Sequence, residues 1–429
     1  MSSVASASSR GEARLALSPG VLFRLSTVAS AAAVGLVVVS AVLELGTTHW
    51  GVALVALPLL VANVVLARLA YPALLVRSVV ALAAFLVAIA LGGVVAWSGD
   101  ATWAAALHVG AAAAALGLGL VVVAGAFRGE ATPLAALRDY ITLTKPRIMT
   151  LLLLTGAAGM FVGAQGVPPL GLFGVTMLGL ALACGGASAL NHVLDRDIDA
   201  LMGSRTERRP VATGRVTPEQ ALEFGIVLSA LSFALLASAV NVLTAVLALV
   251  GNLFYVLVYT RWLKRSTPQN IVIGGAAGAL PPVIGWAAIT GRVEIPALLL
   301  FAMVFYWTPP HFWALALRIR KDYEAAKVPM LPVVKGVPET ARQIALYTLL
   351  LVAISLVFFA VARMGAIYLV AAVVLGGIFL WRAYVLLRQS GSPEGSLAQS
   401  IRLYRFSISY LTLLFVAVAV DSLVLGRLT

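Results

Sequence analysis

The chain has 429 residues, of which 61% are hydrophobic and only 11% are charged, and its mean hydropathy is +1.01. Soluble domains contain about 45–50% apolar and about 25% charged residues, so this composition excludes an ordinary water-soluble protein. The net charge of +13 does not predict a nucleic-acid partner, because basic loops commonly hold membrane helices in place against anionic lipid. Cys184 is the only cysteine, which excludes a disulfide within the chain and a cysteine metal cluster.

Thirteen apolar segments are long enough to cross a membrane, since a spanning helix needs about 20 apolar residues. Four lie in the first third of the chain, at residues 24–46, 51–70, 74–97 and 103–126. Nine follow, at residues 148–164, 170–190, 219–239, 241–260, 271–290, 296–317, 340–360, 365–387 and 404–425. The sequence therefore predicts an all-α membrane protein, in which a nine-helix bundle follows a four-helix N-terminal membrane bundle.

Composition divides the chain into three parts. Residues 1–23 are rich in Ser and Ala and are expected to form a loose cytoplasmic N-terminus. Residues 24–130 form the predicted four-helix bundle, for which an accessory bundle and a heme-binding or assembly module are both open interpretations. A short polar segment then leads to the second predicted domain, which covers residues 138–425.

Basic residues are distributed unevenly between the two sides of the membrane. If the N-terminus is cytoplasmic and the thirteen spans alternate, 27 of the 30 Lys and Arg residues lie in cytoplasmic segments. Cytoplasmic loops characteristically carry this excess of positive charge. The sequence thus predicts a multi-pass protein of the plasma membrane with its N-terminus in the cytoplasm.

An acidic cluster follows the second of the nine later spans. Asn191, Asp195 and Asp199 are spaced i, i+4 and i+8, which places them on one face of a helix. Like charges at this spacing repel one another unless a cation lies between them, and Mg²⁺ is commonly held by one or two carboxylates together with substrate phosphates. Arg208 and Arg209 follow in the next loop, where guanidinium groups could bind the phosphates. A solvated helix end with capping acids is the alternative, but ionisable residues beside an apolar span are more often functional.

A second polar cluster follows the sixth later span and faces the same predicted side. Asp322 is a candidate further metal ligand there, opposite the first cluster. Eight cations are candidates for binding the diphosphate. They come from both clusters and from two other predicted helix ends on the same side: Lys145, Arg147, Arg208, Arg209, Lys264, Arg265, Arg318 and Lys321. Several of these could equally anchor helices at the membrane interface. An active site at the cytoplasmic face is the resulting hypothesis.

These motifs resemble a known family. The run from Asn191 to Asp199, followed by Arg208-Arg209-Pro210, resembles the first aspartate-rich motif of the intramembrane aromatic prenyltransferase superfamily. The segments 143–147, 259–286, 307–317 and 322–332 resemble one group within it, the protoheme IX farnesyltransferases or heme O synthases. The resemblance covers residues 138–425. One departure from the superfamily weakens the case for two symmetric magnesium sites: its second motif usually has two aspartates four residues apart, whereas Asp322 is followed by Ala326 and Lys327.

The resemblance implies substrates, products and a cofactor. The substrates are farnesyl diphosphate and heme b, the products are heme O and diphosphate, and the cofactor is Mg²⁺, with heme A synthase a candidate partner. The implied metal ligands are Asn191, Asp195, Asp199 and Asp322. The aromatic region around His311, with Trp307 and Tyr259, is the candidate heme contact, although an aromatic belt at the membrane interface would have the same composition.

Two other functions remain compatible with the sequence. Another aromatic acceptor, such as a quinone precursor, would use the same diphosphate chemistry. A transporter of an anionic lipid or porphyrin would also be a polytopic helical protein, but transporters carry their ionisable residues near the membrane midplane. Here the acids follow the helices at one end, which favours the prenyltransferase.

Overall fold

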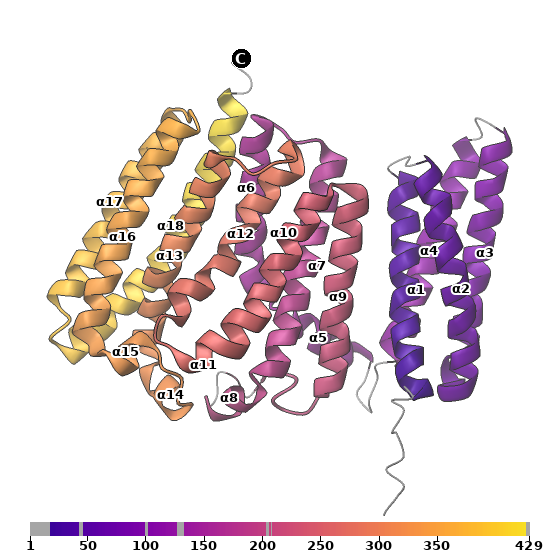
Figure 1. The fold of residues 1–429 in the computed structure, drawn as a ribbon, viewed down its shortest axis with the longest axis horizontal. Helices are drawn as coiled ribbons and strands as arrows, with labels where there is room; N and C mark the ends of the chain where they lie inside the picture. The colour runs from indigo at the N-terminus through magenta and orange to yellow at the C-terminus, as the bar shows by residue number, and fades with distance from the viewer. Residues whose placement is uncertain are drawn as a thin grey trace, which may run out of the picture. The chain divides into compact units, whose positions relative to one another are not determined.

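The computed structural model describes residues 18–42, 46–98, 102–126, 133–202, 206 and 208–425. All regular secondary structure within these ranges is helical (Figure 1). The chain divides into two compact units, Met1–Arg128 and Gly129–Thr429. Long apolar helices in both units confirm the predicted all-α membrane fold class.

The first unit is a bundle of four long helices. They are α1 (Pro19–Val42), α2 (Gly46–Ala70), α3 (Leu75–Ser98) and α4 (Thr102–Ala126), with a short 3₁₀ turn η1 (Pro72–Leu74) before α3. Helix α1 packs on α2 and α4, and α3 packs on α4. Helix α1 begins at Pro19 and not at 24 as predicted, because proline suits the first turn of a helix, where its missing N–H costs nothing. Residues 19–23 are therefore helical.

The second unit contains α5 to α18. Its helices are α5 (Pro133–Leu143), α6 (Pro146–Ala164), α7 (Leu170–Leu194), α8 (Arg196–Leu201), α9 (Pro218–Ala239), α10 (Val242–Leu253), η3 (Phe254–Leu263), α11 (Lys264–Ser266), α12 (Asn270–Thr290), α13 (Ile295–Arg318), α14 (Arg320–Ala325), α15 (Leu331–Val334), α16 (Gly336–Val361), α17 (Ala366–Arg388) and α18 (Pro393–Leu425). Among the described residues, twelve helical segments are long and apolar enough to cross a membrane, and nine of them lie in this unit. The number of membrane crossings in the whole chain stays a prediction.

Helix α12 lies at the centre of the second unit. It packs against α6, α10 and α13, and 67% of its apolar window is buried, more than for any other described span. Glycines allow the close crossing of α6 and α12: a Cβ atom on Gly159 would overlap the carbonyl oxygen of Pro282, and one on Gly285 would overlap that of Gly156. Helix α18 packs on both α6 and α13 and so closes the bundle.

Two of the predicted spans differ from the structure in form. The segment predicted at 241–260 begins as α10 but continues as the π-helix η3 before it ends in α11. In a π-helix the backbone hydrogen bonds join residues five apart and not four apart as in an α-helix, a difference that hydrophobic periodicity does not reveal. The last span begins at Pro393 and not at 404, because polar residues that the hydropathy window excludes continue the same helix.

Short helices collect at one end of the second unit. Figure 1 shows α8, α11, α14 and α15 together at this end. Ile198 and Met202, at the end of the α7–α8 region, belong to the same buried cluster as Ala326 and Val328, which follow α14. This end therefore brings the chain after α7 and the chain after α13 into one packed layer.

Candidate active site at the end of the second unit

The acidic cluster is built where α7 gives way to α8. Helix α7 stops at Leu194, and Asp195 joins the two helices with φ −92° and ψ 2°. Backbone bonds from Asp195 N to Asn191 O (2.9 Å) and from Asp199 N to Asp195 O (2.8 Å) continue across this junction. The sequence reading of one regular helix is therefore replaced by two helices that keep the i, i+4 alignment.

Asn191 and Asp195 bond to each other, and each is also bonded by one lysine. Lys145 Nζ donates to Asn191 Oδ1 at 2.6 Å, and Asn191 Nδ2 donates to Asp195 Oδ2 at 2.8 Å. Lys264 Nζ forms an ion pair with the same Asp195 oxygen at 2.6 Å. Asp195 is only 1% exposed, so this pair is almost fully removed from water. The network joins the first residues of α6, the end of α7 and α11.

Asp199 has a separate cationic partner in the loop that follows α8. Arg209 Nη1 pairs with Asp199 Oδ1 at 2.5 Å, and the Thr206 hydroxyl donates to the Asp199 carbonyl. Asp199 is also 1% exposed, whereas the Arg209 side chain is 29% exposed. Thr206 and Arg209, which follow α8 in the chain, therefore both bond back to Asp199, and the Arg209 side chain stays partly exposed to solvent.

The cluster has more positive than negative groups. Lys145, Arg209 and Lys264 meet the two carboxylates of Asp195 and Asp199, which leaves an excess of one positive charge when Lys145 is protonated. Burial, with a further contribution from neighbouring Arg209, lowers the pKa of Lys145 to about 7. An added anion would relieve this electrostatic cost, so the cluster is suited to bind a negatively charged group.

The backbone at Lys145 is also unusual. It caps α6 in the left-handed region, with φ 50° and ψ 60°, directly before Pro146. A residue other than glycine adopts this conformation at a cost of about 1–3 kcal/mol, and such positions cluster at functional sites. Here the strained backbone directs the ammonium group into the buried network.

Each carboxylate of the cluster has one oxygen without a hydrogen-bond partner. Asp195 Oδ1 and Asp199 Oδ2 are buried and have none among the residues that the structure describes. A buried anionic oxygen left in this way is costly, and it is the ligand type that Mg²⁺ prefers. The donor set therefore fits a magnesium ion that is completed by phosphate oxygens and water.

The structure does not group Asp322 with these two acids. Across the described ranges, no three His, Cys, Asp or Glu side chains lie close enough together to hold a metal ion. Asp322 is half-buried in α14, one helical turn before Ala326, which belongs to the same buried cluster as Ile198 of α8. Its role as a fourth ligand stays a prediction.

The predicted cations fall into three groups. Lys145, Arg209 and Lys264 belong to the buried network. Arg265 lies outside this network and pairs at 2.6 Å with Asp197. The Asp197 side chain is 59% exposed. This pairing lowers the pKa of Asp197 to about 2. The remaining four are exposed: Arg147, Arg208, Arg318 and Lys321.

Two of the three candidate heme contacts are stacked on each other. The rings of Trp307 and His311 lie 4.2 Å apart on α13, at 19° to one another. Ser407 of α18 holds both, since its carbonyl accepts from Trp307 Nε1 at 2.8 Å and its hydroxyl lies 2.7 Å from His311 Nδ1. Tyr259 lies on a different element, η3, where it stacks on Tyr255 at 5.5 Å.

Sequence reasoning missed the part that η3 plays in the cluster. Asn191 Nδ2 donates to the Thr260 hydroxyl at 3.0 Å, and that hydroxyl donates to the Tyr255 carbonyl five residues earlier at 2.9 Å. Thr260 is fully buried. It lies within the 259–286 motif, on the π-helix η3, where its hydroxyl meets Asn191 of α7. His192, next to Asn191, is buried as well, and both of its ring nitrogens lack a hydrogen-bond partner among the described residues.

Comparison with known proteins assigns the family. The UbiA prenyltransferase family model matches residues 152–408. The protoheme IX farnesyltransferase of Symbiobacterium thermophilum is 56% identical over 284 residues, which cover 66% of this chain and 94% of that protein. The corresponding protein of Gloeobacter violaceus is 52% identical over 292 residues, covering 68% and 94% respectively. The chain belongs to the protoheme IX farnesyltransferases.

The assignment is consistent with the structure of the second unit. A solved digeranylgeranylglyceryl phosphate synthase structure superposes with a TM-score of 0.56 at 17% identity and covers 67% of this chain and 98% of its own. That identity supports the fold alone. The resemblance inferred from the motifs is thus confirmed, and the chain is a membrane-bound prenyltransferase with the helical architecture of the UbiA family.

Proposed function

We propose that this farnesyltransferase joins the farnesyl group of farnesyl diphosphate to a vinyl group of heme b, giving heme O, and that residues 138–425 carry the activity. The observation that carries the proposal is the buried network of Asn191, Asp195 and Asp199 with three cations. Proteins commonly bind a diphosphate with cationic side chains and a divalent metal together, and this network offers both the cations and candidate carboxylate ligands for the metal.

The chemistry needs stabilisation of a leaving group more than a strong base. The allylic C–O bond of farnesyl diphosphate breaks, and its electrons leave with the diphosphate. A vinyl carbon of heme b then forms the new C–C bond, water adds to the resulting cation, and one proton is released. Bound Mg²⁺ would act as a Lewis acid that stabilises the charge of the leaving diphosphate.

The side chains of the cluster have distinct roles in this proposal. Asp195 and Asp199 would hold the metal through the buried oxygens that lack a partner. Lys145, Lys264 and Arg209 would donate to the diphosphate oxygens, where fixed cations stabilise charge that develops as the bond breaks. The apolar helices around the cluster would keep water from the allylic cation until the C–C bond has formed.

The orientation in the membrane forms part of the proposal. We expect the multi-pass chain to lie in the plasma membrane with its N-terminus and this site at the cytoplasmic face. Support comes from the uneven distribution of Lys and Arg, and from the position of α8, α11, α14 and α15 at one end of the second unit. Heme A synthase, which would consume heme O, is the expected partner.

One assay tests the proposed reaction. The full chain, purified into lipid nanodiscs, is incubated with Mg²⁺, farnesyl diphosphate and either heme b or 4-hydroxybenzoate, and the products are identified by mass spectrometry. We expect heme O and diphosphate from heme b, and no prenylated benzoate. Prenylation of the benzoate alone would reassign the acceptor, and vesicle flux without diphosphate release would indicate a transporter.

A further inference from the structure

Helix α5 is connected to two of the three cations that meet the acidic cluster. At its C-terminal end the chain runs directly into Lys145, whose backbone N donates to the Thr142 carbonyl at 3.1 Å. Earlier on the same helix, Asp139 is buried and pairs with Arg215, a residue of the loop that carries Arg209. Neither Asp139 nor Arg215 was assigned to the metal or diphosphate site.

The Arg215 side chain bonds to two different parts of the chain at once. Its Nε lies 3.1 and 3.2 Å from the two carboxylate oxygens of Asp139. Its Nη2 donates to the backbone carbonyl of Arg208 at 2.7 Å. That carbonyl belongs to the peptide group that also contains the backbone N of Arg209. One guanidinium therefore ties α5 to the peptide directly before Arg209, as the planar fork of arginine donors permits.

The backbone after Arg209 is fixed as well. The Arg209 carbonyl accepts from the Thr213 backbone N at 3.1 Å and from the Thr213 hydroxyl at 3.0 Å. The Arg209 backbone N donates to the Thr206 carbonyl at 2.9 Å. With its backbone held on both sides, Arg209 directs its guanidinium to Asp199.

Packing holds α5 against the rest of the second unit. An isolated helix of 11 residues is marginal in water, so α5 depends on its tertiary contacts. Leu143 is fully buried in one cluster with Val211 and Val216, which belong to the same loop as Arg209. The Leu143 carbonyl also accepts from Ser188 Oγ of α7 at 2.6 Å. Helix α5 can therefore act as a common support for Lys145 and for the loop.

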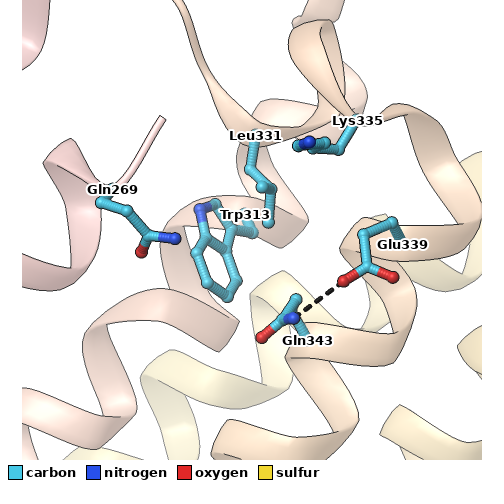
Figure 2. Close-up of a pocket in the computed structure, with 6 residues that line it drawn as sticks. All are labelled: Gln269, Trp313, Leu331, Lys335, Glu339 and Gln343. Atoms are coloured by element: carbon cyan, nitrogen blue, oxygen red, sulfur yellow. Dashed lines mark hydrogen bonds between the residues drawn. The ribbon is translucent and has the colours of Figure 1, made fainter. Parts of the chain in front are cut away.

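An ion pair that only stabilises the fold is the alternative interpretation. The Arg215 side chain is 45% exposed, and exposed pairs contribute little to stability. The Arg342–Glu339 pair is of this ordinary kind, since it joins two residues of α16, and Glu339 also accepts from Gln343 of that helix (Figure 2). The Asp139–Arg215 pair differs because it connects two separate elements and reaches the backbone beside a residue of the acidic cluster.

We propose that Arg215, held by Asp139, is a positioning residue that fixes Arg209 relative to Lys145, so that both cations meet one diphosphate. The inference rests on the proposed function, which places a diphosphate between these cations. Diphosphate oxygens need donors at defined positions, and a misplacement of about 1 Å can lower a rate about 100-fold. Arg215 itself would not touch the substrate.

Binding of farnesyl diphosphate tests the proposal without requiring heme O formation. The full chain in nanodiscs is titrated with radiolabelled farnesyl diphosphate, with Mg²⁺ present and heme b absent. We expect Arg215→Met to weaken binding about tenfold, the effect of losing one hydrogen bond to a charged group. Arg215→Lys keeps the positive charge beside Asp139, but its compact ammonium does not replace the arginine fork, so it should weaken binding to a similar extent.

A double variant separates positioning from stability. If Arg215 acts through Arg209, Arg215→Met should weaken binding no further once Arg209→Gln is present, because effects that pass through one group are not additive. An ion pair that only stabilised the protein would instead change the number of binding sites and leave their dissociation constant unaltered. Arg342→Gln is the matched control, which removes an arginine from another exposed pair and should bind as the wild type does.

The outcomes distinguish this inference from the proposed reaction. Wild-type affinity in either Arg215 variant overturns the positioning role, and so does a double variant whose loss is the product of the two single losses. Because Arg215→Lys keeps a charge beside the buried Asp139, it should fold even if Arg215→Met does not. If no heme O forms while the variants bind as expected, the positioning role stands and the proposed acceptor fails. Absence of farnesyl diphosphate binding by the wild type would overturn both.

Discussion

Replacing Asp199 with asparagine tests the diphosphate site most directly. The change removes one negative charge from a side chain that is 1% exposed and keeps its shape. Arg209 can still donate to the remaining amide oxygen, so the loop over α8 should stay folded. The backbone carbonyl of residue 199 still accepts from Thr206. The lost feature is the second buried anionic oxygen, Oδ2, which lacks a partner among the described residues.

The expected loss of activity is large. Removing one electrostatic group that acts on developing charge typically lowers kcat by about 10²–10³-fold. Substituting a residue that only hydrogen-bonds to a metal ligand lowers metal affinity by about 10–100-fold. Substituting a ligand itself should lower metal affinity at least as much. We therefore expect Asp199→Asn to lower the rate of heme O formation at least about 100-fold and to raise the Mg²⁺ concentration needed for half-maximal rate.

Asp197→Asn is the matched control. It makes the same chemical change two residues away on α8, but Asp197 is 59% exposed and pairs with Arg265 at the surface. Exposed ion pairs contribute only about 0–1 kcal/mol, so this variant should keep its rate to within about fivefold. Rates are measured by mass spectrometry across a Mg²⁺ titration, with thermal unfolding as a check on folding. A folded Asp199→Asn protein with the wild-type rate and Mg²⁺ dependence would refute the metal-binding role.

Two further predictions concern how the site is positioned. Thr260→Val should lower kcat about tenfold, because Asn191 loses the hydroxyl that accepts from its amide. Thr260→Ser keeps that hydroxyl and should retain activity. Equal rates in the two variants would contradict this role. Gly159→Ala should lower the melting temperature, because the new methyl group overlaps the Pro282 carbonyl oxygen at the α6–α12 crossing. Gly174→Ala, where no atom lies within 4 Å of the added Cβ, should not, and a similar loss in both would argue against the close crossing.

Much of the architecture could be predicted from hydropathy alone. Apolar segments of about 20 residues require internally bonded helices in a bilayer, so the fold class follows from simple counting. The ends of helices were less predictable, as Pro19 and Pro393 show, because caps and polar turns extend a helix beyond the apolar window. The winding of η3 could not be predicted, since the same apolar pattern is compatible with α- and π-helical turns.

The acidic part of the site could be predicted from the sequence because its residues lie close together along the chain. Asn191, Asp195 and Asp199 are neighbours on consecutive turns, and the i, i+4 rule brings them together without knowledge of the fold. The sequence could not predict which of the eight candidate cations would contact these three residues. That choice depends on how α6, α11 and the loop after α8 pack, and it selects Lys145, Lys264 and Arg209.

The contrast between Lys264 and Arg265 shows why charge patterns are ambiguous at the membrane edge. The two residues are adjacent, and each pairs with an aspartate of the α7–α8 segment at 2.6 Å. Lys264 is buried against Asp195, whereas Arg265 is exposed with Asp197. Breaking a buried pair by removing one partner costs about 3–5 kcal/mol, whereas an exposed pair contributes little. Two adjacent cations thus differ in burial and in partner because their side chains leave the chain in different directions, which only the packed structure determines.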